Sequence, residues 1–296
     1  MDKPLVSVLT ITRNRGNLLG RCISSVLSQT YTNIEHIIVD GASDDNTDEV
    51  VGGFKDERLR FIKLDYNWPL KKTSDYGVSL CKGKYITFLD SDDEYIPSKI
   101  EKQVRLIESL SIDYGFVYCW MTYYDSKKNE RIRIHSTQLR GNVEFESIST
   151  PCISGTPTLL FRASVLREVG GWKSPEEIGI ASDWEMCSRV CQKYKTDFVP
   201  ESLVNVYINH GMVRQSESAS YYQDVYNRTI KFHSYFLNTY SEKFKKRPDL
   251  KYYHYWMMCV AGVSAKHRMK AVEFFFKAFA SNPRMMTKTI LERIKI

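Results

Sequence analysis

The first hundred residues alternate short apolar runs with segments that repeat apolar side chains at helical spacing. The runs that predict buried strands cover residues 5–11, 34–40, 59–64 and 84–89, and the segments that predict helices cover residues 17–29, 73–82 and 97–109. Because strands and helices alternate with short connections, we expect an α/β fold whose mostly parallel sheet is flanked by helices.

Polar residues follow three of these expected strands. Thr12, Arg13 and Asn14 end the first strand, Asp40 ends the second, and an acidic segment begins at Asp90 after the fourth. In open parallel sheets, ligands bind at the carboxyl ends of the strands. The sequence therefore predicts one binding site built from three strand ends.

The fourth strand runs directly into Asp90, Asp92, Asp93 and Glu94, which place four carboxylates within five residues. These charges repel one another, and an acidic loop in water is the simplest interpretation. The alternative is a hard divalent cation held by carboxylates together with a diphosphate. Such a cation would remove the repulsion and make the diphosphate a better leaving group.

The sequence lacks the motifs of two common classes of phosphate-binding protein. No G-x-G-x-x-G follows the first strand, where the sequence reads "TITRNRGNLLG", and no G-x-x-x-x-G-K-[ST] occurs anywhere. A nicotinamide-binding fingerprint and a Walker-type ATP site are therefore not expected.

Basic residues gather near the end of the chain. Residues 243–296 hold 13 Lys or Arg and 3 Asp or Glu, a net charge of +10, whereas the other 242 residues hold 29 and 32, a net charge of −3. This segment predicts an anionic partner, with membrane lipid, nucleic acid and polyphosphate as the candidates. No recognised nucleic-acid motif accompanies the charge, so no nucleic-acid partner is expected.

Several features favour a cytoplasmic protein. No run of 18 apolar residues predicts a membrane span. The start of the chain, "MDKPLVSVLT", lacks the pattern of a signal peptide. The seven cysteines are scattered and form no C-x-x-C pair, as expected for reduced thiols.

Five blocks of the sequence, in this order and spacing, resemble the family 2 glycosyltransferases. The blocks are "VSVLTITRN", "CISSVLSQTYTNIEHIIVDGASDDNT", "GKYITFLDSDDEYIP", "GTPTLLFRASVLREVGGW" and "ASDWEMCSRV". The resemblance implies a Rossmann-like GT-A catalytic domain over residues 1–215, which bind a nucleotide-diphospho-sugar, and leaves an all-helical, basic C-terminal extension over residues 216–296. The implied activity is inverting transfer of one sugar to a hydroxyl of a saccharide.

The resemblance also implies a nucleotide site. The residues carried over to it are Ile11, Thr12, Arg13, Asn14, Asp40, Lys72, Asp90 and Ser91. Arg13 stands where many relatives have an aromatic residue, and its guanidinium plane can stack on uracil or simply face solvent. Asp40 resembles the acid that accepts the uracil N3–H, which favours UDP, but it could instead hold a turn. Lys72 lies in a segment that departs from the family pattern.

Asp92 resembles the family's ligand for a divalent metal, Mn²⁺ or Mg²⁺, within the Asp90-Ser91-Asp92 motif. His210 lies where relatives often have a histidine near the diphosphate, and it is expected to complete the metal shell, touch a phosphate, or be structural. Arg214 is expected against a phosphate or at the donor-sugar and acceptor site.

Asp183 takes the position of the catalytic base, in a block that matches the family's E-D-x-[DE] helix start. Ser182 replaces a second acid that is frequent in relatives, and Asp183 could instead only cap a helix over residues 184–194. Gly171 and Trp172 are expected to shape the donor-sugar and acceptor sites, although Trp172 could simply pack in the core.

Helical patterns continue over residues 219–240, 249–262 and 266–280. The last combines Lys and Arg with four Phe, which predicts a membrane-surface helix, or one packed on the catalytic body or on a second copy. The expected partners are a UDP-sugar donor, a saccharide or lipid-linked saccharide acceptor, a membrane surface and a homo-oligomer. The expected location is cytoplasmic or peripheral on the inner face of the cell membrane.

No Q-x-x-R-W motif occurs, so a processive synthase is not expected. The predicted role is the addition of one sugar in the synthesis of a bacterial cell-surface polysaccharide or glycolipid. Two alternatives stay open. One is a metal-dependent nucleotidyltransferase, although "TRNRGN" is only a weak version of its loop. The other is a non-catalytic nucleotide-sugar binding module.

Overall fold

The computed structural model describes residues 3–151, 153, 155–211 and 224–294. The chain forms two compact units. The first, here called the strand unit, comprises Met1–Val143, Ile153–Trp172 and Arg189–Met212, and the second, the helical unit, comprises Glu144–Cys152, Lys173–Ser188 and Val213–Ile296. The domain boundary predicted between residues 215 and 216 falls outside the described residues and stays a prediction.

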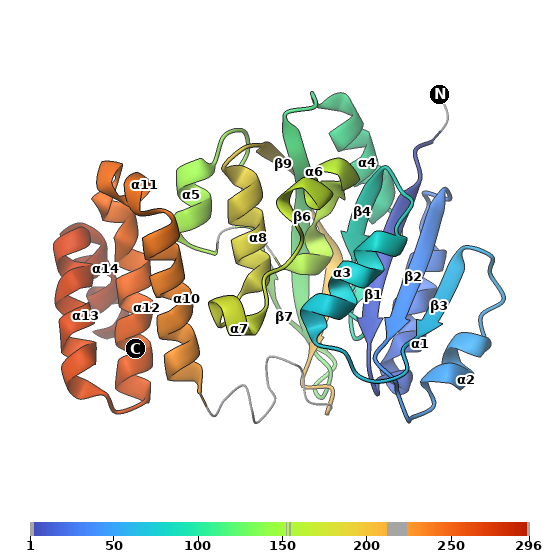
Figure 1. Ribbon diagram of the computed structural model, residues 1–296, viewed down its shortest axis with the longest axis horizontal. Helices are drawn as coiled ribbons and strands as arrows, with labels where there is room; N and C mark the ends of the chain where they lie inside the picture. The colour runs from blue at the N-terminus through green and yellow to red at the C-terminus, as the bar shows by residue number, and fades with distance from the viewer. Residues whose placement is uncertain (1–2, 152, 154, 212–223, 295–296) are drawn as a thin grey trace. The chain divides into compact units, whose positions relative to one another are not determined.

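The strand unit is built on one mixed sheet. Its strands are β1 (Val6–Thr12), β2 (Ile34–Asp40), β3 (Leu59–Lys63), β4 (Tyr85–Phe88), β5 (Glu94–Tyr95), β6 (Tyr114–Asp125), β7 (Glu130–His135), β8 (Leu160–Arg162) and β9 (Lys195–Ile208). They follow the order β3-β2-β1-β4-β8-β6-β9-β5, and β7 pairs with β6. The predicted parallel half is confirmed, because β1 pairs in parallel with β2 and β4, and β2 pairs with β3 (Figure 1).

The other half of the sheet mixes directions. β8 runs antiparallel to both β4 and β6, while β6 and β9 run parallel. β5 and β7 are added antiparallel to β9 and β6. This arrangement brings the end of β9 next to the acidic segment that follows β4, because β5 belongs to that segment.

Helices cover the strand unit, namely α1 (Gly16–Leu27), α2 (Thr47–Gly52), α3 (Leu70–Leu80), α4 (Lys99–Ser109), η1 (Thr156–Thr158) and α6 (Ala163–Val169). α1 shows why such segments fold. Its residues Leu19, Cys22, Ile23 and Val26 recur at helical spacing and are fully buried in the main core. Each buried aliphatic side chain contributes about 1.5–3 kcal/mol, so this stripe fixes the helix on the sheet.

The helical unit contains α5 (Glu144–Ser149), α7 (Pro175–Ile178), the start of α8 (Ser182–Cys191), α10 (Val225–Thr239), α11 (Ser241–Lys246), η3 (Pro248–Leu250), α12 (Lys251–Ser264), α13 (Arg268–Ser281) and α14 (Pro283–Ile294). The predicted helical extension is confirmed, and Figure 1 shows α10, α12 and α13 side by side. Gly262 allows α12 and α13 to approach closely, because a Cβ there would lie 3.1 Å from the Cβ of Ala271. In the described part of the chain, no helix is long and apolar enough to cross a membrane.

Candidate active site

The loops that follow β1 and β2 are joined by hydrogen bonds. Asn14 N donates to Ser43 Oγ at 2.8 Å, and Asp44 N donates back to Asn14 Oδ1 at 3.0 Å. Gly16 N, at the start of α1, donates to Asp45 Oδ2 at 2.9 Å. Two of the three predicted strand ends therefore form one connected structure.

Asp40 holds the second of these loops. It is fully buried, and both of its carboxylate oxygens accept hydrogen bonds from Ser43, one from the backbone N at 2.9 Å and one from the hydroxyl. Ala42 between them has a φ of 59°, a left-handed conformation that is strained for alanine. The N-cap of α2 is Asn46, and the first turn of this helix is held by Asp45, which accepts from Thr47 N at 3.0 Å.

The end of β1 presents Ile11, Thr12 and Arg13. Ile11 is partly buried and Arg13 is exposed, while Thr12 Oγ1 is buried and has no partner among the described residues. A Cβ on Gly41 would lie 3.6 Å from Arg13 Cβ and 3.0 Å from Asn67 Oδ1. The missing Cβ of Gly41 therefore lets Arg13 and Asn67 lie close to the end of β2.

An aromatic cluster lies beside the end of β3. Lys72 Nζ is 3.9 Å from the centroid of the Trp68 ring, which packs edge-on against Tyr66 at 6.1 Å and Tyr76 at 5.5 Å. Such a contact between a cation and an aromatic ring fixes the Lys72 side chain. The sequence prediction included Lys72 but missed Trp68 and the preceding Asn67. The available signal was "YNWP", an aromatic and amide-bearing loop directly after a strand.

The carboxylate of Asp92 contacts a guanidinium and an imidazole. Its Oδ2 accepts from Arg15 Nη1 at 2.7 Å and lies 3.0 Å from His210 Nε2. The side chains of Asp92 and His210 are only 6% and 3% exposed. Arg21 Nη2 donates to the backbone oxygen of Asp92 at 2.6 Å. In the same motif Asp90 is exposed and Ser91 is buried.

The other two acids of the cluster are held by β9. Tyr207 N donates to Asp93 Oδ1 at 3.0 Å, and the Tyr207 hydroxyl donates to Glu94 Oε2 at 2.8 Å. Arg21 lies over the Tyr207 ring, 3.5 Å from its centroid. Cations and hydrogen-bond donors therefore offset the repulsion among these carboxylates. The sequence prediction missed Arg15, three residues after the end of β1, and Arg21, on α1.

The chemistry of the donor set fits a divalent cation shared with a phosphate ligand. No group of three or more His, Cys, Asp or Glu able to hold a metal occurs among the described residues. However, Asp92 and His210 bring a carboxylate oxygen and an imidazole nitrogen together, and both are suitable ligands for Mn²⁺. Mg²⁺ is commonly bound by one or two carboxylates plus substrate phosphates. The two side chains thus suit a site that a diphosphate completes.

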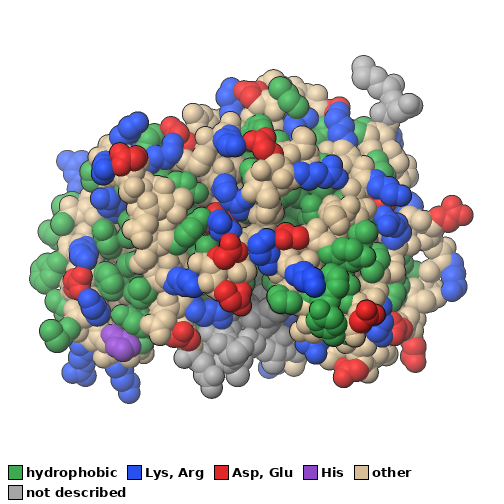
Figure 2. Space-filling model, viewed as in Figure 1, with side chains coloured by type: hydrophobic (Ala, Val, Ile, Leu, Met, Phe, Trp, Pro, Cys, Tyr) green, Lys and Arg blue, Asp and Glu red, His purple; other side chains and the backbone are tan. Residues whose placement is uncertain are grey.

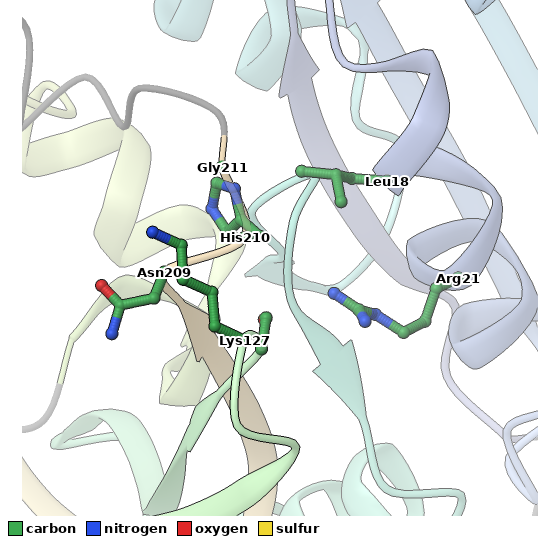
Figure 3. A pocket seen from close by; sticks show the side chains of 7 residues that line it. Leu18, Arg21, Lys127, Asn209, His210 and Gly211 are labelled. Carbon is green, nitrogen blue, oxygen red and sulfur yellow. The ribbon is translucent and has the colours of Figure 1, made fainter.

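A pocket of about 330 Å³ adjoins His210. Its walls come from three segments, with Leu18 and Arg21 on α1, Ser126 and Lys127 after β6, and Asn209, His210 and Gly211 after β9. In Figure 3, Arg21 extends from α1 into the space that Lys127 and His210 border on the opposite side. Three basic side chains make this pocket suitable for an anion.

Asp183 is the second residue of α8. The helix begins at Ser182, so Asp183 lies in its first turn and is not the cap of a helix over 184–194. Its Oδ1 accepts from Trp184 N at 2.8 Å. The side chain is partly buried, and desolvation by the surrounding protein raises the pKa of its carboxyl above the ordinary value. A raised pKa makes the carboxylate a stronger proton acceptor.

Trp184 anchors this turn in an aromatic cluster. Its indole Nε1 donates to Ser147 O at 2.6 Å, and its ring lies 4.7 Å from the centroid of Phe236 and 5.2 Å from that of Phe232. His254 stacks on Trp184 with an interplanar angle of 13°. The residue next to Asp183 is thereby fixed by α5, α10 and α12. The sequence prediction did not include this cluster.

Two buried histidines complete the cluster. His254 Nε2 lies 2.8 Å from the carbonyl oxygen of Ile148, so this nitrogen carries the proton and donates. His254 Nδ1 must then accept, and it does so from His233 Nδ1 at 2.9 Å. Burial lowers the pKa of His254 to about 4 and that of His233 to about 2. Both rings are therefore neutral near pH 7.

Gly171 and Trp172 follow α6. Gly171 has a φ of 64°, its carbonyl oxygen accepts from Arg189 Nη2 at 2.7 Å, and a Cβ there would lie 3.1 Å from Asp75 Oδ1. The partly buried Trp172 packs edge-on against Phe88, with ring centroids 4.4 Å apart. The structure thus shows a packing contact for Trp172, and its contact with a sugar stays a prediction. Arg214 lies outside the described residues.

Comparison with known proteins identifies relatives of this chain. Residues 7–169 match the family model described as glycosyl transferase family 2. An uncharacterized glycosyltransferase of Methanocaldococcus jannaschii, MJ1057, is 26% identical over 75% of this chain and 79% of its own length. The Escherichia coli UDP-Glc:α-D-GlcNAc-diphosphoundecaprenol β-1,3-glucosyltransferase WfaP is 35% identical over 38% of this chain. That match spans only 45% of WfaP.

Solved structures show the same architecture. Staphylococcus aureus TarS, solved with UDP-GlcNAc, superposes with a TM-score of 0.69 at 15% identity over 95% of this chain and 82% of that one. The mannosyltransferase PcManGT of Pyrobaculum calidifontis, solved with GDP-Man and Mn²⁺, gives a TM-score of 0.61 at 16% identity over 99% of this chain and 80% of that one. With more than half of its length matched by the family model, the chain belongs to glycosyl transferase family 2, a family of sugar-transferring enzymes, and has their GT-A fold.

Proposed function

We propose that this enzyme transfers one sugar from a UDP-sugar to a hydroxyl of a saccharide acceptor, with inversion at the anomeric carbon. The observation that carries the proposal is the polar edge of the parallel sheet. There the loops after β1 and β2 are hydrogen-bonded to each other, and Arg15, from the first of them, pairs with Asp92 after β4. This edge is where ligands bind in sheets of this kind.

The donor nucleotide would occupy this edge. Ile11, Thr12 and Asn14 would line the base pocket, and the exposed guanidinium of Arg13 would stack on the uracil ring. Asp40 would accept the uracil N3–H while it holds its loop. The preference for UDP is supported by WfaP and by a second Escherichia coli relative, WfgD, because both names specify UDP-Glc. Lys72, Asp90 and Ser91 are proposed to contact the rest of the nucleotide.

Asp92 and His210 are proposed to hold the divalent cation, because they converge at 3.0 Å. The cation would neutralise the diphosphate and so make it a better leaving group. Arg15 and the basic residues of the pocket beside His210 supply further positive charge around the same carboxylate. Arg214 is proposed to approach the donor phosphate or sugar.

Asp183 is proposed as the base. It takes the proton of the acceptor hydroxyl while that oxygen forms a bond to the anomeric carbon, and the bond from this carbon to the donor phosphate oxygen breaks. The nucleoside diphosphate leaves with the bonding electrons, and the configuration inverts. The raised pKa of Asp183 supports this role, because a general base works best with a pKa moved toward the working pH. Gly171 and Trp172 are proposed to shape the sugar and acceptor sites.

A lipid-linked saccharide is the proposed acceptor. WfaP and WfgD are named for transfer to α-D-GlcNAc-diphosphoundecaprenol. Because this chain spans less than half of either relative, their acceptor is carried over only as a proposal. The corresponding role is one step in building a cell-surface polysaccharide or glycolipid, on the cytoplasmic side of the membrane.

A release assay tests this function. The protein is incubated with Mn²⁺ or Mg²⁺ and a panel of UDP-, dTDP- and GDP-sugars, and the free nucleoside diphosphate is measured. We expect metal-dependent release from one UDP-sugar, lost in Asp92→Ala and Asp183→Ala and kept in the surface control Asp249→Asn. Metal-dependent UDP binding with no release, even with GlcNAc-diphosphoundecaprenol added, would instead indicate a binding module. No release and no binding would contradict the proposed function.

A further inference from the structure

Helix α13 has three distinct faces. The first carries Ala271, Phe274 and Ala278, which are buried against the rest of the helical unit. The second carries Lys270, Glu273 and Lys277, which form ion pairs along the helix at 3.0 and 2.6 Å. Because the inward face already provides the packing, the remaining side of the helix has no structural need for large apolar residues.

The third face is nevertheless apolar. Met269, Val272, Phe276 and Phe279 recur at helical spacing and are 89%, 55%, 63% and 43% exposed. On α14, Met285 and Leu291 are also exposed, at 43% and 54%. Single exposed apolar side chains are ordinary, whereas a continuous stripe of them marks an interaction surface.

Basic residues flank this stripe along the chain. Lys266, Arg268 and Arg284 are exposed and form no ion pair among the described residues, and Lys288 is exposed on α14. Figure 2 shows hydrophobic and basic side chains, with a few acidic ones, intermingled at the left edge of the view, over α13. Residues 243–296 as a whole carry 13 Lys or Arg and 3 Asp or Glu. The occupant of the stripe must therefore offer both an apolar layer and negative charge.

We propose that this face of α13 lies on the surface of a membrane that contains anionic lipid. An amphipathic helix with exposed Phe and Met and basic neighbours inserts its apolar side chains at the boundary between headgroups and acyl chains. Lys and Arg near the surface attract anionic headgroups. A second copy of this chain would instead bring two strongly basic segments together, and like charges repel.

Binding to a surface, and not insertion across it, matches the dimensions of the helix. α13 has 14 residues and one of its faces is charged, whereas a spanning helix needs about 20 apolar residues. The proposal goes beyond sugar transfer and does not depend on it, because vesicle binding is measured without donor or acceptor. A failure of either proposal therefore leaves the other testable.

Co-sedimentation with vesicles provides the test. The full chain is mixed with vesicles of phosphatidylcholine, or of phosphatidylcholine with phosphatidylglycerol, at low and high salt. We expect binding to the anionic vesicles that weakens with salt. The stripe variant Val272→Ser/Phe276→Ser/Phe279→Ser and the charge variant Lys266→Glu/Arg268→Glu/Arg284→Glu should each bind about tenfold more weakly or worse.

Control variants distinguish binding by the exposed face of α13 from non-specific binding to vesicles. Ile112→Ser removes an apolar side chain that is 74% exposed in the strand unit, and Lys55→Glu reverses an exposed charge there. Both should bind as the unmodified chain does, and all variants should keep its thermal unfolding midpoint. Equal binding by the stripe variant, or no binding by the unmodified chain, would overturn the proposal. So would a dimer that the stripe variant abolishes without any vesicle binding.

Discussion

Asp92 and Asp183 are two carboxylates with opposite surroundings. Asp92 lies in the strand unit, where its Oδ2 meets Arg15 at 2.7 Å and His210 at 3.0 Å. Asp183 lies in the helical unit, where it accepts a hydrogen bond from Trp184 N and adjoins an aromatic cluster. The Arg15 guanidinium pairs with the first carboxylate, whereas desolvation raises the pKa of the second.

The difference between these surroundings suits the two carboxylates to different chemical roles. A carboxylate beside a guanidinium is suited to a site shared with a diphosphate, because the carboxylate oxygens can ligate a divalent cation and the guanidinium favours the phosphate charge. A carboxylate next to buried rings is suited to taking a proton, because its charged form is less well solvated. Pairs of acids whose environments differ in this way commonly have different roles.

The largest expected effect concerns the ring that anchors Asp183. Trp184→Ala removes an indole buried among Phe232, Phe236 and His254, and such losses cost about 3–5 kcal/mol in the free energy of unfolding. Urea unfolding measures this change. Tyr66→Ala, at a ring that is 59% exposed in the strand unit, should change stability little. A loss below about 1 kcal/mol for Trp184→Ala would show that the cluster does not anchor α8.

The next effect is acid sensitivity from the buried histidines. Unfolded histidines bind protons near pH 6.5, whereas folded His254 stays neutral down to about pH 4 and His233 to about pH 2. The unfolded state therefore binds more protons below pH 6.5, and stability should fall as the pH falls from 6.5 toward 4. The gap for His254 corresponds to about 3 kcal/mol. Denaturant unfolding at several pH values measures the slope.

His254→Asn is the variant that isolates this effect. It removes one of the two titrating groups and keeps a side chain that can donate to Ile148 O. We expect a shallower fall in stability between pH 6.5 and 4 than in the unmodified chain. His233 and His36, whose pKa values burial also lowers, should leave a residual slope in both proteins. An unchanged slope in His254→Asn would contradict the assignment.

A smaller effect should appear in the pH dependence of turnover. Asp183 must be ionised to act as a base, and its pKa is raised above 3.8 by desolvation. The turnover rate at saturating donor should therefore fall at low pH, about tenfold per pH unit, with a midpoint above 3.8. Activity regained after return to pH 7 controls for acid unfolding. A midpoint at or below 3.8 would argue against a desolvated base.

The smallest effect concerns the choice of nucleobase. Asp40→Asn removes the charge proposed to accept the uracil N3–H, so UDP binding should weaken about tenfold and CDP binding should not. Competition assays with both nucleotides measure the difference. Asp44→Asn, at an exposed acid of the same loop, is the control. Equal weakening of UDP and CDP would leave Asp40 only the loop-holding role that its bonds to Ser43 show.

The parallel half of the sheet could be predicted from the sequence because its strands are local apolar runs. The pairing of β6 with β9 could not, because Tyr114 and Lys195 are partners across eighty-one positions of the chain. Local patterns carry no information about such distant partners. The helices of the C-terminal extension were predicted from their spacing, but not which of their faces would be buried.

In the candidate site, too, some features could be predicted from the sequence and others could not. The strand ends and the nearness of His210 to the acidic motif followed from residue types and from the family resemblance. Arg15, Trp68 and the anchoring of Trp184 did not, because each acts through contacts that only the folded chain creates. For Asp40, the sequence predicted a ligand contact, and the structure shows that this residue holds its own loop through hydrogen bonds from Ser43.

The central claim is that Asp92 serves donor binding and Asp183 serves chemistry. The most direct test measures donor affinity by calorimetry with Mn²⁺, and turnover by nucleoside diphosphate release, in Asp92→Asn and Asp183→Asn side by side. The account predicts that Asp183→Asn binds the donor normally but turns over about 10²–10⁴-fold more slowly, and that Asp92→Asn binds at least about tenfold more weakly. Normal turnover in Asp183→Asn, or normal metal-dependent binding in Asp92→Asn, would contradict it.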